Sequence, residues 1–263
     1  MIFSHLDWHN RYLMQSHWTR DVRQYLYKRI DIGSINSILD VGCGSGVLEA
    51  ELAQITRAVV VAIDLERPIL QLATQNSPST RYAQADGHYL PIETSSFDLV
   101  ICHFLLLWVE RPHQVLAEMA RIARPGGVVM AIAEPDYGGR IDYPFELEQL
   151  GVWQVKSLQA QGANPLIGRR LQALFKQAGF SQIETGVLGG QWSAEMETQD
   201  RQAEWEMLEY DLSQLGADQV DRTKLRSLKN LDEKACRNGE RLLFVPTFYA
   251  WGRTATATTY SPS

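Results

Sequence analysis

The chain has 263 residues, of which 45% are hydrophobic and 21% charged, and its formal net charge is −6. This composition excludes a disordered or collagen-like chain. The acidic charge argues against a nucleic-acid partner, which would require a basic surface. The three cysteines are widely spaced and include no CxxC pair, so neither a zinc site nor a disulfide framework is indicated, and we expect no metal.

The N-terminal segment is polar and lacks the apolar stretch of a signal peptide. The longest apolar run, residues 99–109, has about 11 residues, whereas a membrane-spanning helix needs about 20. We therefore expect a cytoplasmic protein without a membrane span. Residues 5–30 carry aromatic and aliphatic side chains three or four positions apart, which predicts a helix.

From residue 37 onward, apolar runs typical of strands alternate with segments of helical period. The run 58–63 contains no polar residue, which is typical of a strand buried on both faces of a parallel sheet. This alternation predicts an α/β domain with right-handed crossovers. The predicted strands are 37–42, 58–63, 82–85, 97–102, 128–133, 180–188 and 242–251, and the predicted helices are 47–54, 68–75, 115–124, 145–161, 169–178 and much of 194–236.

A glycine-rich turn follows the first strand, in the segment Ile-Leu-Asp-Val-Gly-Cys-Gly-Ser-Gly (38–46). Alternate glycines let the backbone turn sharply and approach a ligand closely. A nicotinamide fingerprint, G-x-G-x-x-G, would place its third glycine at Val47, but here it comes one residue early. Asp40, two residues before the first glycine, would repel a pyrophosphate but could pair with an ammonium group.

Two more aspartates end the next strands. Asp64 follows Gly42 by 22 residues, where a carboxylate accepts hydrogen bonds from ribose hydroxyls. Asp86 ends the third strand, within reach of an adenine amine. The strand ends thus offer partners for an ammonium group, a ribose and an adenine, but none for a phosphate. That set fits S-adenosylmethionine.

The segments LDVGCGSG, AIDLE, AQADGHYLP and the run from Phe97 to Pro135 together resemble the class I S-adenosylmethionine-dependent methyltransferases, in the small-molecule branch that includes the ubiquinone and menaquinone biosynthesis enzymes. The resemblance covers residues 36–135 and extends more loosely to Trp251. It implies a Rossmann-like α/β fold with a seven-stranded, mostly parallel sheet of order 3-2-1-4-5-7-6, helices on both faces and a helical cap.

The sequence contains no internal repeat and no Pro/Ser-rich linker, which predicts how the chain is organised. We expect a single domain, 1–253, followed by a disordered tail, 254–263. The domain would consist of an N-terminal helical lid (5–30), the cofactor-binding core (36–135) and a helical insertion at about 194–238.

The resemblance also implies a set of cofactor-binding residues. Asp40 and the glycines that follow it would hold the methionine end of the cofactor. Asp64 and Leu65 would hold the ribose and adenine, and Asp86 and Gly87 would hold the adenine. Lid residues would cover the cofactor. The predicted cofactor-binding residues are Tyr12, Gln15, Trp18, Asp40, Gly42, Cys43, Gly44, Gly46, Asp64, Leu65, Asp86, Gly87, His88 and His103.

Candidates for the chemistry come from the ends of the fourth and fifth strands. His103 follows the fourth strand, where a general base would stand, although its backbone alone could be what matters. The loop after the fifth strand is a candidate for acceptor binding, the alternative being a solvated loop with an internal Asp–Arg pair. Trp108 could line a pocket or belong to the core. The predicted acceptor-binding residues are Trp108, Glu134, Asp136, Tyr137 and Arg140.

We therefore predict an S-adenosylmethionine-dependent methyltransferase that acts on a small, partly apolar metabolite. Nucleic-acid enzymes of this fold that methylate amino groups carry an (Asn/Asp)-Pro-Pro-(Tyr/Phe) tetrapeptide after the fourth strand, but residues 102–105 read Cys-His-Phe-Leu. The catalytic Pro-Cys dipeptide of cytosine C5 methylation is also absent from the sequence. The main alternative is a non-catalytic S-adenosylmethionine-binding regulatory module, and a nicotinamide-dependent oxidoreductase is the third. The sequence leaves open the acceptor, the attacked atom and the oligomeric state, for which a homodimer is one candidate.

Overall fold

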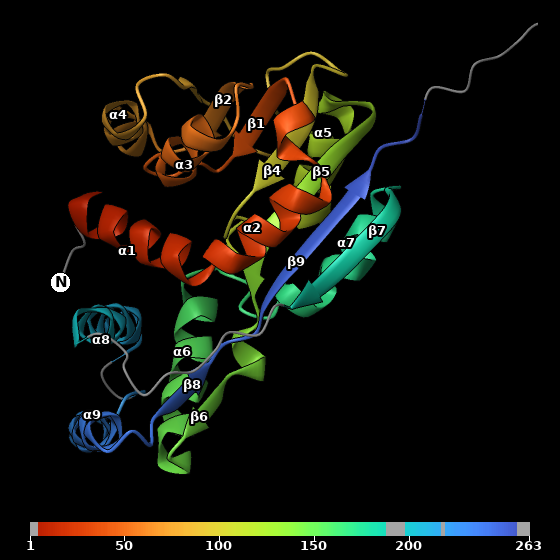
Figure 1. Ribbon diagram of the computed structural model, residues 1–263. Coiled ribbons are helices and arrows are strands. Elements are labelled where there is room, and N and C mark those ends of the chain that lie inside the picture. The colour runs from red at the N-terminus through yellow and green to blue at the C-terminus, as the bar shows by residue number, and fades with distance from the viewer. Residues whose placement is uncertain (1–4, 188–197, 217–218, 257–263) are drawn as a thin grey trace, which may run out of the picture.

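The computed structural model describes residues 5–187, 198–216 and 219–256, and a seven-stranded sheet is their largest element (Figure 1). In the order in which they lie side by side, the strands are β3 (Arg81–Gln84), β2 (Val59–Asp64), β1 (Ser37–Val41), β4 (Phe97–Cys102), β5 (Ala123–Pro135), β9 (Thr247–Arg253) and β7 (Ser181–Val187).

The topology confirms the predicted fold class. β1 to β5 are parallel, whereas β9 is antiparallel to both β5 and β7. Numbered along the chain within this sheet, β7 is the sixth strand and β9 the seventh, so the order is 3-2-1-4-5-7-6. Two further strands, β6 (Ile141–Tyr143) and β8 (Leu242–Phe244), pair with each other outside the main sheet.

Helices cover both faces of the sheet because successive side chains of a strand point to opposite faces. Ile38 of β1 packs with Leu26 and Leu52, on the face covered by α2 and α3. Leu39, the next residue, packs with Met119 and Phe175, on the face covered by α5 and α7. In Figure 1, α2 crosses in front of the central strands. The helices around the sheet are α1 (His5–Trp18), α2 (Arg20–Arg29), α3 (Val47–Ile55), α4 (Arg67–Asn76), α5 (Pro112–Ile122) and α7 (Leu171–Gln177).

A second hydrophobic core lies beside the sheet, in the lower part of Figure 1. It is built by α6 (Glu148–Ala160), α8 (Thr198–Ser213) and α9 (Arg222–Arg237), whose apolar side chains pack around Trp153 and Trp205. The Asp221 side chain caps α9 by accepting hydrogen bonds from the N–H groups of Thr223 and Lys224. Short 3-10 turns lie at Ile32–Ser34, Tyr137–Gly139, Phe145–Leu147 and Gly168–Arg170.

Two predicted elements are divided in the structure. The helix expected over 5–30 is interrupted at Thr19, whose hydroxyl donates to the Gln15 carbonyl and competes with the helical backbone bonds. The strand expected over 242–251 is split at Pro246, which lacks an N–H group and so cannot continue a ladder. As a result, the chain leaves β8 and enters the main sheet as β9.

The division into lid, core and insertion stays a prediction. Residues 188–197, where the insertion was expected to begin, and 257–263 of the expected tail lie outside the described residues. Thr254, the first residue of that tail, still donates from its backbone N–H to the Gly127 carbonyl at 3.0 Å.

Candidate functional site

The glycine loop stands at the carboxyl end of β1. Gly42, Gly44 and Gly46 have φ angles of +80°, +54° and +79°, a region that other residues rarely adopt. A Cβ atom at Gly44 would lie 2.9 Å from the Tyr12 ring, and one at Gly42 would lie 2.8 Å from Leu105. The loop therefore requires glycine both for its backbone angles and for the close approach of its neighbours.

Asp40 lies at the carboxyl end of β1, just before this loop, with 1% of its surface exposed. Its Oδ1 atom meets no hydrogen-bond donor in the described residues. Burial raises the pKa of Asp40 to about 6. A buried carboxyl oxygen without a donor is a place where a cationic or N–H-bearing ligand group would be stabilised.

Asp64, at the end of β2, is fixed against the glycine loop. Its Oδ2 accepts from the Gly44 N–H at 2.9 Å, and its Oδ1 accepts from the Glu66 N–H at 3.0 Å. Leu65, which lies between Asp64 and Glu66 in the sequence, is 58% exposed. Each carboxylate oxygen keeps a second lone pair, so Asp64 can still accept from ligand hydroxyls.

Asp86 and His88 form a pair after β3. Asp86 Oδ1 accepts from the His88 N–H at 2.9 Å and lies 2.7 Å from His88 Nδ1, and these bonds lower the pKa of Asp86. His88 Nε2 accepts from the Arg111 N–H, just before α5, at 3.3 Å. Asp86 therefore stays ionised and exposed, while His88 holds its loop against α5. Gly87 packs against Val41 and Val115.

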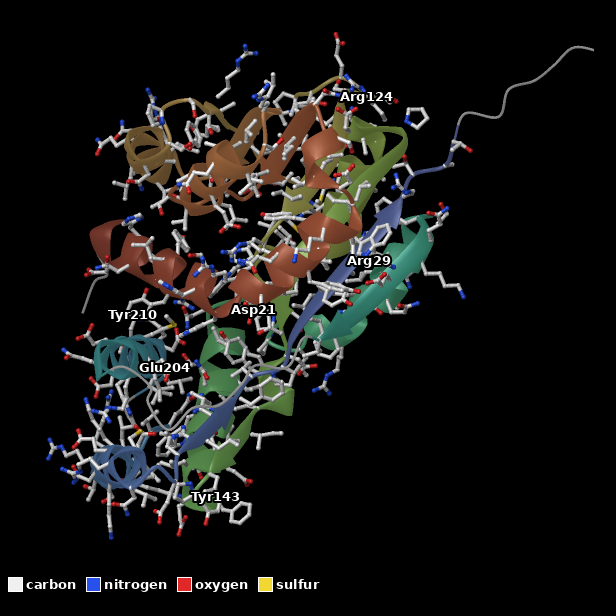
Figure 2. All side chains as sticks on the ribbon, viewed as in Figure 1. Asp21, Arg29, Arg124, Tyr143, Glu204 and Tyr210 are labelled. Carbon is white, nitrogen blue, oxygen red and sulfur yellow. The ribbon has the colours of Figure 1, made fainter. Side chains whose placement is uncertain are left out.

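Helix α1 lies over the glycine loop. The Tyr12 ring contacts Gly44, and His9 Nδ1 lies 2.7 Å from Ser45 Oγ, between two of the glycines. Helix α1 also meets α8, where Trp8 and Tyr210 pack edge to face. Figure 2 labels Tyr210 on the side of α8 that is turned toward α1. The lid role of α1 stays a prediction.

His103 follows β4 and is held by the residue that joins α1 to α2. Its Nε2 lies 2.9 Å from Thr19 Oγ1, which in turn donates to the Gln15 carbonyl. Burial, together with the nearby Arg23 guanidinium, lowers the pKa of His103 to about 3. A neutral imidazole whose Nε2 is already bonded is a weak candidate for the general base predicted at this position.

A cavity of about 320 Å³ opens between the start of α2, the loop after β4 and the second core. Its wall is mostly apolar and aromatic, and its size falls in the lower range of small-molecule sites. Phe104 and Thr19, the first adjacent to His103 in the chain and the second bonded to it, line one end of the cavity. The lining residues are Trp18, Thr19, Phe104, Pro135, Tyr137, Arg140, Leu150, Gln154, Glu204, Trp205, Met207, Leu208, Asp232, Arg241, Leu243, Phe244, Val245 and Thr247.

The polar part of this wall includes Gln154, Glu204 and three members of a buried network of two arginines and two aspartates. Arg140, Arg241 and Asp232 line the cavity, whereas Asp142 binds the arginines without lining it. Asp142 accepts from Arg140 Nε at 2.6 Å and from an Arg241 terminal nitrogen at 2.6 Å. Arg241 Nε donates to Asp232 at 2.5 Å, and the Trp205 indole N–H donates to the other oxygen of Asp232 at 2.7 Å. The four charged side chains carry two positive and two negative charges, so the network is electrically balanced.

The amino-acid sequence and the fold point to one family. Residues 39–131 match the family described as "Methyltransferase domain". These residues are a class I S-adenosylmethionine-dependent methyltransferase domain. Within the described residues, the chain has no helix with the length and apolarity needed to cross a membrane. The part of the chain that the structure describes also contains no group of three His, Cys, Asp or Glu side chains that could hold a metal ion.

Curated relatives match parts of this chain. Methyltransferase GfsG of Streptomyces halstedii is 34% identical over 125 residues, 45% of each chain. A malonyl-[acyl-carrier protein] O-methyltransferase of Buchnera aphidicola is 33% identical over 94 residues, 36% of this chain and 38% of that protein. The chain thus spans less than half the length of these curated relatives.

Among solved structures, phosphoethanolamine N-methyltransferase 2 of Haemonchus contortus, in complex with S-adenosyl-L-methionine, shares the fold with a TM-score of 0.58. Its identity is 17%, and the alignment covers 89% of this chain and 53% of that one.

The residues at the glycine loop fit S-adenosylmethionine, the cofactor of this family. Asp40 offers a buried acceptor without a donor in the described residues, and the glycine backbone forms a cradle that a Cβ atom would fill. Gly46 caps α3, so the amino end of that helix also faces the loop. Among the predicted residues, Asp64 and Tyr12 contact the glycine loop, and Asp40 directly precedes it in β1. Trp18 lines the cavity instead.

The predicted acceptor residues divide into two groups. Tyr137 and Arg140 line the cavity, whereas Trp108, Glu134 and Asp136 do not. Glu134 is fully buried and accepts from the backbone N–H groups of residues 105–107 at 2.8–3.1 Å. Asp136 forms an ion pair with Arg169. Both carboxylates hold the fold of the loops that surround the cavity.

Sequence reasoning missed most of the polar cavity wall. Trp205 stands out in the sequence only as part of an apolar stripe with Leu208 and Leu212, and it packs in the second core as such a stripe predicts. Its indole N–H, however, binds Asp232, which comes from another helix. No local pattern signals that contact.

Proposed function

We propose that the protein transfers a methyl group from S-adenosylmethionine to a small, partly apolar, uncharged acceptor bound in the 320 Å³ cavity. The observation that carries this proposal is the position of the cavity. Phe104 and Thr19, which flank His103, form one end of it, and the loop after β4 lies over the glycine loop through the Leu105–Gly42 contact. An acceptor in the cavity would thus face the methionine end of the cofactor site.

The chain's own residues would mainly bind and orient. Asp40 would pair with the cofactor's ammonium group, Asp64 with its ribose and Asp86 with its adenine. When bound, the cofactor supplies an activated methyl group on a sulfonium. Trp18 and Phe104 would exclude water from the place of transfer. His103, neutral and bonded to Thr19, would support the loop rather than remove a proton. As the methyl group moves from sulfur to the acceptor atom, the proton of a hydroxyl or amide acceptor would pass to water.

The acceptor's charge follows from the cavity wall. Arg140 and Arg241 both donate to Asp142, and Arg241 also donates to Asp232, so these charges are already paired. A charged acceptor would bury another charge beside a balanced network, at a cost of several kcal/mol unless it found a partner. An uncharged body with a hydrogen-bonding group suits the aromatic wall better.

The test joins cofactor binding to turnover. We expect calorimetry to show binding of S-adenosylhomocysteine that Asp64→Ala abolishes. We then expect labelled methyl transfer to uncharged aromatic and aliphatic hydroxyl or amide compounds, and none to carboxylates. Malonyl-acyl carrier protein, the acceptor in the name of one relative, is the anionic comparison. Methylation of that acceptor would overturn the uncharged class.

A matched pair of variants ties turnover to the cavity. Trp205→Ala removes both an aromatic wall and the bond to Asp232, whereas Met207→Leu, at another lining position of the same helix, changes little of the wall's shape. We expect the first variant to lose turnover at unchanged cofactor affinity and the second to keep it. Cofactor binding without transfer to any compound would favour the regulatory module over the enzyme.

A further inference from the structure

Glu49 is a buried carboxyl that the proposed methyl transfer does not use. It is the third residue of α3, and its side chain is fully buried. Neither of its carboxyl oxygens meets a donor from the described residues. An isolated buried carboxylate is expensive, so this position calls for a physical explanation.

The explanation lies in its contact with Asp40. The two carboxyl groups are within hydrogen-bonding contact, from α3 and from the end of β1. Asp40 Oδ1 is likewise without a donor in the described residues. If Glu49 carries a proton, its O–H donates to Asp40, and one bond satisfies an orphaned atom on each side. Each carboxylate oxygen has two lone pairs, so Asp40 can still accept from the cofactor's ammonium group.

The surroundings favour that arrangement. The titratable groups that face the pair are Asp64 on β2, Cys43 in the glycine loop, Tyr82 on β3 and Tyr27 on α2, all acidic or neutral. Arg23 of α2 also stands near Tyr27, but its charge is engaged by Glu51 at 2.6 Å.

Two touching carboxyl groups without a cation do not both ionise. Burial raises the pKa of Asp40 to about 6 and raises that of Glu49 well above its usual range. The pair therefore loses its first proton near pH 6 and keeps the second at neutral pH, on Glu49.

We propose that Glu49 is a positioning residue that stays protonated and donates a hydrogen bond to Asp40, so that one carboxylate charge, not two, faces the cofactor's ammonium group. The inference rests on the cofactor site of the proposed function but is independent of the acceptor. It assigns Glu49 a role in cofactor binding without placing it in contact with the cofactor.

Substitutions at the two positions separate this role from its alternatives. Glu49→Gln keeps the shape and supplies an amide donor, so we expect its affinity for S-adenosylhomocysteine at pH 7.5 to stay within about threefold of the unchanged chain. Glu49→Leu removes the donor, and we expect about a tenfold loss. Asp40→Asn removes the charge itself, and we expect a loss of about a hundredfold or more. Calorimetry measures all three.

Two results would overturn the inference. If Glu49→Gln weakened binding as much as Asp40→Asn, Glu49 would be an ionised ligand rather than a donor. If Glu49→Leu bound as tightly as the unchanged chain, Glu49 would play no part in positioning Asp40. Circular dichroism of each variant establishes that it is folded.

A second measurement needs neither the cofactor nor the leucine variant. An infrared difference spectrum is recorded at neutral pH by subtracting the spectrum of Glu49→Gln from that of the unchanged chain. We expect this difference spectrum to contain the carbonyl band of a protonated carboxylic acid. The absence of this band would overturn the inference. Failure of the unchanged chain to bind S-adenosylhomocysteine would instead remove the proposed function, while the infrared spectrum would still report the proton on Glu49.

Discussion

Thr19 Oγ1 lies 2.9 Å from His103 Nε2. This contact joins the break between α1 and α2 to the loop after β4. The same hydroxyl lies 2.7 Å from the Gln15 carbonyl and accepts from Arg23 at 2.7 Å. The Thr19 hydroxyl has a single proton, and it donates that proton to the Gln15 carbonyl, which can only accept. Its contact with His103 is therefore a hydrogen bond only if His103 Nε2 carries a hydrogen and donates it. His103 is then a donor to the lid, not a base toward the cavity.

The first prediction is that His103 stays neutral throughout the physiological range. Burial and Arg23 lower its pKa from 6.5 to about 3. Because the unfolded chain binds this proton below pH 6.5 and the folded chain does not, the contribution to stability is present above pH 6.5. It is lost as the pH falls toward 3, by at most about 1.4 kcal/mol per pH unit.

The measurement for His103 is an NMR titration of its ring, combined with urea unfolding between pH 7 and pH 4. His103→Gln keeps a side-chain donor and should remove this part of the pH dependence. A ring that titrates near pH 6.5 in the folded protein would contradict the buried network and restore the general-base interpretation.

The second prediction concerns the glycine loop. Gly44→Ala places a Cβ atom 2.9 Å from the Tyr12 ring at a φ of +54°, so we expect the loop or α1 to shift and the affinity for S-adenosylhomocysteine to fall at least about tenfold. Gly162→Ala is the matched control. Its φ is +84°, but nothing lies within 4 Å, so it should lose about 1 kcal/mol of stability and no cofactor affinity.

Calorimetry and thermal unfolding of both glycine variants decide the point. Equal cofactor affinities in the two variants would mean that neither the added Cβ atom nor the strain at Gly44 disturbs the cofactor site.

The cofactor end of the site was predictable from sequence because its residues follow strands. Parallel strands end at one edge of a sheet, so Asp40, Asp64 and Asp86 come from strand ends that the apolar runs already mark. The glycines between them are required by positive φ angles, which leave a clear trace in the sequence.

The cavity wall was not predictable in the same way. Asp232 binds Trp205 and Arg241, and these contacts join two helices to the segment that leads into a short strand. Hydrophobic periodicity reports which face of a helix is buried, but not which distant polar group meets it. Glu134 illustrates the opposite error: its place after a strand suggested a ligand, but its partners are backbone N–H groups, which no sequence pattern displays.

The third prediction is a pH dependence of cofactor affinity. In the free protein the pKa of Asp40 is raised to about 6, and the cofactor's ammonium group favours the ionised form. Below pH 6, binding must therefore displace a proton, and affinity for S-adenosylhomocysteine should fall by up to about tenfold per pH unit. Above pH 7 this contribution should be constant. Calorimetry in two buffers of different ionisation enthalpy counts the released protons, and Asp40→Asn should release none.

The last prediction compares a buried and an exposed ion pair. Asp142 is 2% exposed and accepts from both Arg140 and Arg241, so Asp142→Asn leaves two buried guanidinium groups with too little negative charge. We expect a loss of about 3–5 kcal/mol in the free energy of unfolding.

The matched control is Glu209→Ala, which removes the pair with Lys229 but keeps the Lys229 ammonium group over the Trp205 ring. The two side chains of this pair are 39% and 44% exposed, and such pairs contribute about 1 kcal/mol or less. Urea unfolding measures both changes. Because the network also forms part of the polar wall of the cavity, Asp142→Asn should abolish acceptor binding while Glu209→Ala leaves it intact. A loss below about 1 kcal/mol in the free energy of unfolding for Asp142→Asn would show that water or a rearranged Asp232 compensates the charges of the two arginines. That result would contradict an acceptor restricted to uncharged compounds.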